Sequence, residues 1–136
     1  MARIASNSYP MRSLFKTRNS ARVNPETEAM KKKYGEITML DFPQFTKDTF
    51  PDVHHMDVWS SLFGDFSDGT MFAQNEFNPA SASGRKWLDQ FASKIATTGV
   101  KVTIENHWGV SADPIHVRTI LDEVNHPFCE ASPERK

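Results

Sequence analysis

The chain has 136 residues, of which 16 are basic and 17 are acidic, so its formal net charge is -1. This length predicts one domain, and it is shorter than the roughly 250 residues of a complete barrel of eight strands and eight helices. A nearly neutral chain has no overall field to attract nucleic acid or an anionic membrane, so we expect neither as a partner.

The residue composition also bears on the compartment. Cys129 is the single cysteine, which excludes an internal disulfide and fits a reducing environment. No apolar stretch approaches the ~18 residues of a membrane span, and the first residues lack the apolar core of a secretory signal. We therefore expect a cytoplasmic protein. The basic residues between Arg3 and Lys33 are better interpreted as a solvated segment than as a nucleic-acid arm.

The first predicted strand covers residues 4–8, and Pro10 stops it. Asn7 and Tyr9 lie at the polar end of this strand, where the ligand-facing residues of a barrel would be. The equal alternative is that these residues form an ordinary exit from strand to loop. Residues 11–35 are polar and charged with little apolar periodicity, which predicts a loop or a loosely held helix.

A helix is predicted at residues 41–50, with Asp41 as its N-cap and Pro43 in its first turn. Residues 61–82 are rich in Gly, Asp, Ser, Asn and Phe, which predicts an irregular linker with a short strand at residues 71–73.

Between these two segments, residues 53–59 predict a second strand that ends at Trp59. Its adjacent His54 and His55 invite a metal-site hypothesis. Because neighbouring strand residues point to opposite faces, we expect one exposed and one packed histidine rather than a shared ion.

A strong amphipathic helix is predicted at residues 83–98, with the apolar stripe Trp87, Phe91 and Ile95 and with Gly99 as its C-cap. This stripe indicates core packing rather than a ligand box. A helix is also predicted from Asp113 to Val124, with Ile115, Val117, Ile120, Leu121 and Val124 facing inward, followed by a short strand at residues 128–131 that would bury the Cys129 thiol.

The most informative strand lies between these two helices, at residues 100–104. Glu105 follows it directly. In parallel α/β proteins functional side chains lie on the loops after the carboxyl ends of the strands, so Glu105 is a candidate for chemistry. The alternative is a carboxylate at the strand end that pairs with a nearby lysine or arginine.

The segments I-E-N-H-W-G, V-S-A-D-P, V-R-T-I-L-D-E-V and N-H-P-F follow one another from Ile104 to Phe128. This succession resembles the sugar phosphate isomerase/epimerase family, which has a xylose isomerase-like TIM barrel. For a chain of this length the resemblance implies a partial (β/α) barrel, roughly half of one, with parallel strands and flanking helices. Residues 1–136 would then be a single incomplete barrel-like domain.

The resemblance also implies roles for individual residues. Glu105 matches a metal-binding glutamate that acts as acid or base, and His107 would contact the substrate or orient the site. Glu134 takes the place of a metal-binding aspartate. A divalent manganese, magnesium or zinc ion would be held weakly or not at all, because other ligands of the family lie on strands that this chain lacks. The residues expected to bind substrate are Asn7, Tyr9, Trp59, Asn106 and Trp108.

Two functions are expected on this basis. The first is metal-assisted proton transfer on a sugar, sugar phosphate or polyol, impaired by the missing strands. The alternative is a half-barrel without catalysis that is stable or active only through self-association or a partner, since an incomplete barrel exposes sheet edges. A third reading, a metal-dependent endonuclease on the same barrel, would need several zinc ligands and a basic groove, which the sequence does not display.

Overall fold

The computed structural model describes residues 5–16 and 24–104, together with residues 115, 118, 122, 125, 127 and 129–131. Helices, 3-10 helices (η) and strands alternate along this chain. Their order is β1 (Ala5–Asn7), η1 (Arg12–Leu14), α1 (Pro25–Tyr34), α2 (Phe42–Thr49), β2 (His55–Asp57), η3 (Ser60–Leu62), η4 (Gly69–Met71), β3 (Phe72–Ala73), β4 (Glu76–Phe77), α3 (Ala82–Thr98), β5 (Lys101–Ile104) and β6 (Cys129–Ala131).

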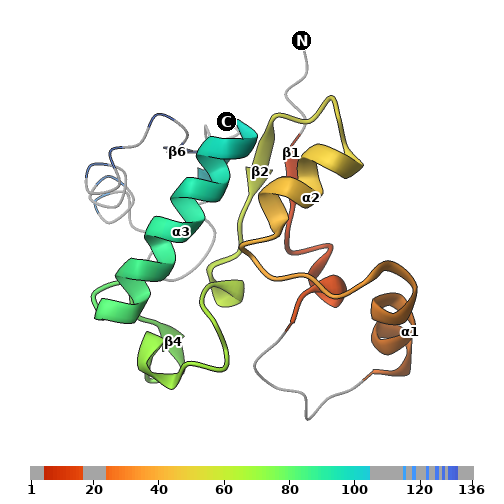
Figure 1. Ribbon diagram of the computed structural model, residues 1–136, viewed down its shortest axis with the longest axis horizontal. Helices are drawn as coiled ribbons and strands as arrows, with labels where there is room; N and C mark the ends of the chain where they lie inside the picture. The colour runs from red at the N-terminus through yellow and green to blue at the C-terminus, as the bar shows by residue number, and fades with distance from the viewer. Residues whose placement is uncertain are drawn as a thin grey trace.

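Four of these strands form one parallel sheet in the order β1-β2-β5-β6. Helices α2 and α3 lie side by side over this sheet (Figure 1). The strands predicted at residues 4–8, 53–59, 100–104 and 128–131 are thus confirmed with shorter bounds, and the chain is a mixed α/β protein. The strand before Glu105 pairs with neighbours on both sides, so it is an inner, parallel strand.

One row of side chains fixes which face of the sheet the helices cover. Ser6, Met56 and Val102 are paired across β1, β2 and β5, and all three are buried. Met56 and Val102 belong to the same apolar cluster as Phe42 of α2 and Phe91 of α3. Apolar burial of this kind contributes about 25 cal/mol per Å². The helical layer therefore packs on this face.

A buried hydrogen bond between two hydroxyl groups also positions helix α2 on the sheet. The Ser6 and Thr46 hydroxyls lie 2.8 Å apart, and Thr46 is fully buried in α2. Because a buried hydroxyl without a partner is costly, this pair fixes the position of α2 along β1.

Helix α3 agrees closely with its prediction. Trp87, Phe91 and Ile95 are all buried, so the stripe is core. The Ser81 hydroxyl accepts a hydrogen bond from the Gly84 amide and caps the helix. At the other end Gly99 has φ of 70°, the left-handed conformation that favours glycine at a C-cap.

For the two preceding helices, the N-cap predicted for α2 is wrong, and the helical alternative predicted for the region of α1 is confirmed. The Asp41 side chain does not cap α2, because its carboxylate accepts hydrogen bonds from the Thr38 amide and hydroxyl instead. Residues 25–34, predicted as a loop or a loosely held helix, form helix α1 with an Asn24 cap and no buried residue. Capping rather than apolar packing accounts for this helix.

The segment at residues 61–82, predicted as an irregular linker, contains an aromatic cluster and a hairpin. Phe63 and Phe77 contact Trp87 of α3 with ring centroids 5.3 Å apart in each case. Between β3 and β4 the two turn residues Gln74 and Asn75 have φ of 49° and 67°, as a tight hairpin of type I′ requires. The aromatic residues do not recur with a helical or strand period, so their packing against α3 could not be predicted from the sequence pattern.

Local hydrogen bonds also lower the pKa of one carboxyl group in this segment. The Asp65 carboxylate accepts from the Ser67 hydroxyl and amide, which lowers the pKa of Asp65, and the charge of Lys16 acts in the same direction.

One inward-facing expectation is wrong. Ile115, predicted to pack on the sheet, is 74% exposed. Arg118 and Asp122 follow Ile115 by three and seven residues, so they lie on the same helical face as Ile115. They form an exposed ion pair with a distance of 2.8 Å. Ile115 therefore belongs to the solvent side. Val117, Ile120, Leu121 and Val124 and the Cys129 side chain lie outside the described residues.

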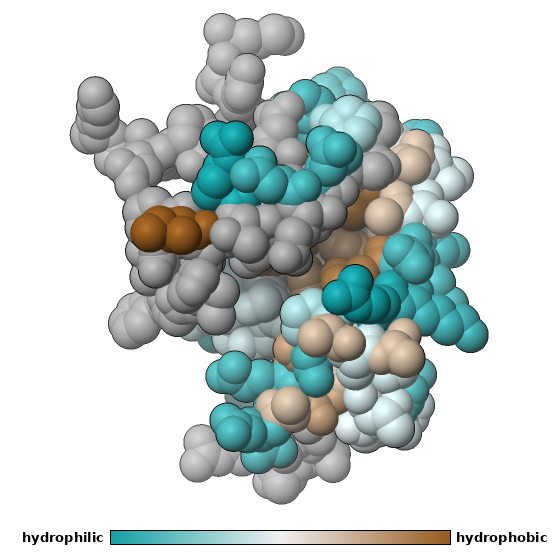
Figure 2. Space-filling view, turned by 90° about the vertical axis from the view of Figure 1, so that its left-hand side faces the viewer, coloured by the Kyte–Doolittle hydropathy of each residue, from teal (hydrophilic) through white to brown (hydrophobic). Residues whose placement is uncertain are grey.

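Figure 2 shows one side of the molecule, where most of the coloured surface residues are hydrophilic and apolar ones lie toward the centre. Among the described helices, none combines the length and the apolar character that crossing a membrane requires.

Gly84 provides a test of this packing. An added Cβ at Gly84 would overlap the Asn78 carbonyl oxygen and lie 2.8 Å from the Ser81 hydroxyl. Alanine normally stabilises a helix by about 1 kcal/mol relative to glycine, but here we expect Gly84→Ala to destabilise the protein by about 1–3 kcal/mol. Urea unfolding measures the difference.

Gly69→Ala is the matched control, because a Cβ there meets nothing within 4 Å. It should change stability by no more than about 0.5 kcal/mol. An increase in stability for Gly84→Ala would contradict the described helix start.

Candidate functional site

Polar residues form a row across the sheet at the carboxyl ends of its strands. Asn7, Asp57, Thr103 and Glu130 are paired in register on β1, β2, β5 and β6. Side chains alternate along a strand, so Asn7, Asp57 and Thr103 lie on the face opposite to the buried row under the helices. We call these three residues the polar row.

The polar row is held together by a cross-strand hydrogen bond. The Thr103 hydroxyl donates to the Asp57 carboxylate, and it also lies 3.3 Å from the Met56 carbonyl oxygen. Thr103 is buried and Asp57 is half-buried. A hydrogen bond to a carboxylate is stronger than one between neutral groups, so this contact fixes the orientation of the Asp57 side chain.

Ser8 joins the two loops that follow β1 and β2. Its amide donates to the Asp57 carbonyl oxygen over 3.0 Å, and its hydroxyl accepts from the Trp59 amide over 2.8 Å. Ser8 is fully buried. The backbone that carries Trp59 is therefore fixed against the end of β1.

Two aromatic side chains stand beyond the polar row. The rings of Tyr9 and Trp59 meet edge to face, with centroids 5.0 Å apart, and are 51% and 38% exposed. The Asn7 side-chain oxygen accepts from the Tyr9 amide over 2.9 Å, which ties the pair to the polar row. Such rings offer an apolar surface for a ligand next to polar groups that can bind its hydroxyls.

Arg12 completes this group. Its guanidinium carbon lies 4.4 Å from the centre of the Tyr9 ring, and its Nη1 donates to the Tyr9 carbonyl oxygen over 2.9 Å. We call Tyr9, Arg12 and Trp59 the aromatic platform. It is built from residues 9–12 and the loop after β2, which are far apart in the sequence.

Three of the predicted substrate-binding residues, Asn7, Tyr9 and Trp59, are brought together by the structure. Sequence reasoning missed Ser8 and Arg12. The available signal for Arg12 was its spacing of three residues from Tyr9, which brings two side chains together in a turn. The other predicted site residues lie outside the described residues: Glu105, Asn106, His107, Trp108 and Glu134.

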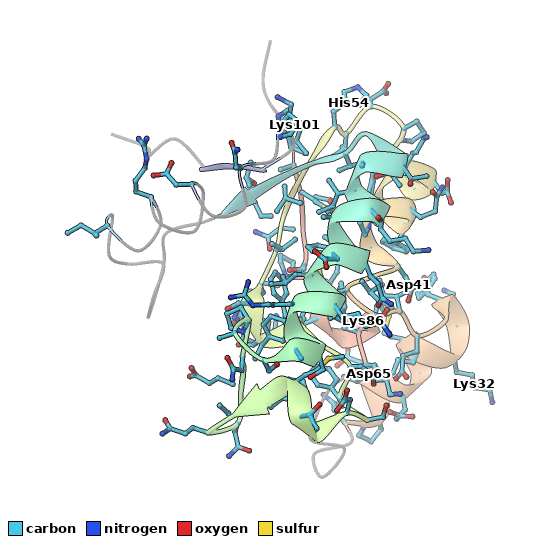
Figure 3. The ribbon with its side chains drawn as sticks, turned by 60° about the vertical axis from the view of Figure 1, so that its left-hand side comes forward. Lys32, Asp41, His54, Asp65, Lys86 and Lys101 are labelled. Carbon is cyan, nitrogen blue, oxygen red and sulfur yellow. The ribbon has the colours of Figure 1, made fainter. Side chains whose placement is uncertain are left out.

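The described residues do not fit a divalent metal site. No group of three or more His, Cys, Asp or Glu side chains meets in the described part of the chain. Asp57 is the carboxylate of the polar row, and Thr103 already donates to it. His54 and Lys101 lie at the opposite end of the sheet, where β2 and β5 begin (Figure 3). His54 is exposed and His55 is half-buried, as expected.

A separate groove of about 530 Å³ lies in the helical layer. It runs between α2 and α3 and is lined by Leu40, Asp41, Gln44, Phe45, Ser93, Lys94, Thr97 and Thr98. None of the residues of the polar row or of the aromatic platform lines it. The groove is therefore distinct from the edge of the sheet at which the carboxyl ends of the strands lie, which we call the carboxyl edge.

Ser8→Ala tests the connection between the two loops. It removes the acceptor of the part-buried hydrogen bond from the Trp59 amide to the fully buried Ser8, so we expect a loss of about 1–3 kcal/mol in urea unfolding. Ser60→Ala, at an exposed position one residue beyond Trp59, should stay within about 0.5 kcal/mol of the parent. Equal stability of Ser8→Ala and the parent would contradict the described role of Ser8.

Comparisons with protein-family models, with curated proteins and with solved structures find no match to this chain. Its function is therefore argued from the polar row and the aromatic platform.

Proposed function

We propose that this chain is a sugar- or polyol-binding protein of the sugar phosphate isomerase/epimerase type, with its site at the carboxyl edge of the sheet. The observation that carries the proposal is the polar row of Asn7, Asp57 and Thr103 beside the exposed Tyr9 and Trp59. Amide and carboxylate groups such as those of Asn7 and Asp57 bind sugar hydroxyls, and an aromatic ring packs on the C–H face of a sugar.

The strand order supports a partial (β/α) barrel as the finer description of the fold. The four strands follow one another across the sheet in chain order and are all parallel. The connections from β1 to β2 and from β2 to β5 pass through α2 and α3, which contact each other in one layer. A doubly wound sheet would reverse its strand order and place helices on both faces. A barrel does neither.

Proton transfer is the proposed chemistry. Glu105 follows directly after Ile104, the last residue of β5, and β5 also carries Thr103 of the polar row. We assign Glu105 the role of general base toward a carbon next to a sugar carbonyl, with His107 as its partner. The ligands that the resemblance implies for a divalent ion, Glu105 and Glu134, lie outside the described residues, and no step is assigned to a metal ion.

Solvent exchange tests this chemistry. The protein is incubated in D₂O with a panel of ketoses, with and without added manganese, and deuterium in the sugar is measured by NMR. We expect exchange by the parent chain and a loss of about a hundredfold or more in Glu105→Gln, because general acid–base groups contribute about 10²–10⁴ in rate. Glu76→Gln, an exposed carboxylate of β4, is the matched control and should exchange like the parent.

The alternative is a half-barrel without catalysis that acts through self-association or a partner. It is favoured by the position of β1 and β6, which are the outer strands of the sheet among the described residues, since outer strands can pair with another chain. Equal exchange by the parent and Glu105→Gln would remove Glu105 from the mechanism. Absence of exchange in every variant would favour this alternative.

A further inference from the structure

We infer that Arg12 makes the site at the carboxyl edge selective for a ligand that carries an anionic group. The inference rests on the proposed function, and it concerns which sugars or polyols the site accepts. Arg12 thereby becomes a specificity-determining residue, which neither its position in the sequence nor the family resemblance indicates.

The first argument is that Arg12 is held in place. Its guanidinium lies against the Tyr9 ring and donates to the Tyr9 carbonyl oxygen over 2.9 Å. The Tyr9 amide in turn donates to Asn7, so the segment that carries Arg12 is tied to β1. A positioned guanidinium loses less conformational entropy on binding than a free one.

The second argument is that the charge remains available. Arg12 is exposed, and within the described residues no carboxylate forms an ion pair with it. A guanidinium has five N–H donors, and the contact with Tyr9 engages one nitrogen. The remaining donors form the planar fork that binds a phosphate or a carboxylate through two parallel hydrogen bonds.

The third argument is the distribution of charge over the site. Asp57 supplies a carboxylate within the polar row, whereas Arg12 supplies a guanidinium against the Tyr9 ring. A neutral polyol could use the polar row alone. A ligand with hydroxyl groups at one end and an anionic group at the other would engage both parts, with its middle on the Tyr9 and Trp59 rings.

Two kinds of ligand share this chemistry, namely sugars with a phosphate monoester and sugar acids with a carboxylate. Titration calorimetry with fructose, fructose 6-phosphate and glucuronate separates them. We expect the parent chain to bind at least one anionic sugar about tenfold to a hundredfold more tightly than fructose. Which of the two anionic sugars is preferred identifies the source of the charge.

Arg12→Gln should abolish this preference, because it removes the guanidinium that would bind the anionic group. Arg12→Lys keeps the charge but not the planar fork, so it should retain part of the preference. Arg85→Gln removes an exposed arginine of α3 and serves as the matched control, which should bind all three sugars like the parent. Circular dichroism and urea unfolding of each variant establish that it is folded before its affinities are compared.

The outcomes separate this inference from the proposed function. Binding of fructose and both anionic sugars with equal affinity would overturn the role of Arg12 and leave the proposed function standing. The same holds if Arg12→Gln keeps the full preference. Absence of binding for all three sugars by the folded parent would overturn both.

Discussion

Burial of Ser6, Met56 and Val102 beneath α2 and α3 is the constraint on which the rest of the structure depends. These residues pair across three parallel strands, so their common burial fixes the register of the sheet. Side chains alternate along a strand, and a shift of one residue would turn the opposite row under the helices. The register therefore also determines that polar side chains gather at the carboxyl edge on the other face.

The carboxyl edge then gains its shape from hydrogen bonds between segments distant in sequence. Ser8 connects the ends of β1 and β2, and Thr103 of β5 orients Asp57 of β2. A binding surface benefits from such fixed neighbours, because ordering side chains during binding opposes affinity. The exposed Tyr9 and Trp59 rings are thus presented by buried contacts behind them. The residues that stabilise this edge are thus the same ones that the proposed function uses for recognition.

Sequence reasoning succeeded where a local pattern carries the information. The period of the α3 stripe predicted its buried residues, and the ends of the predicted strands placed Asn7, Tyr9 and Trp59 at one edge of the sheet, where the structure brings them together. It failed for Arg12, because contact with the Tyr9 ring depends on the turn that follows β1. It failed for Ile115, because an apolar residue at a helix start can lie on either face and its ion-paired neighbours determine which. The aromatic cluster between η3 and α3 has no period at all, and long-range packing alone organises it.

The register of the sheet can be tested by disulfide formation in a background where Ser replaces Cys129. Neighbouring strands lie about 4.7–4.9 Å apart, within the Cα separations that a disulfide spans. Asn7→Cys with Asp57→Cys places two thiols in register on one face, so mild oxidation of the folded protein should link them, as mass spectrometry would show. Ser6→Cys with Asp57→Cys places them on opposite faces and should leave both free. Efficient linkage of the second pair, or none in the first, would contradict the account.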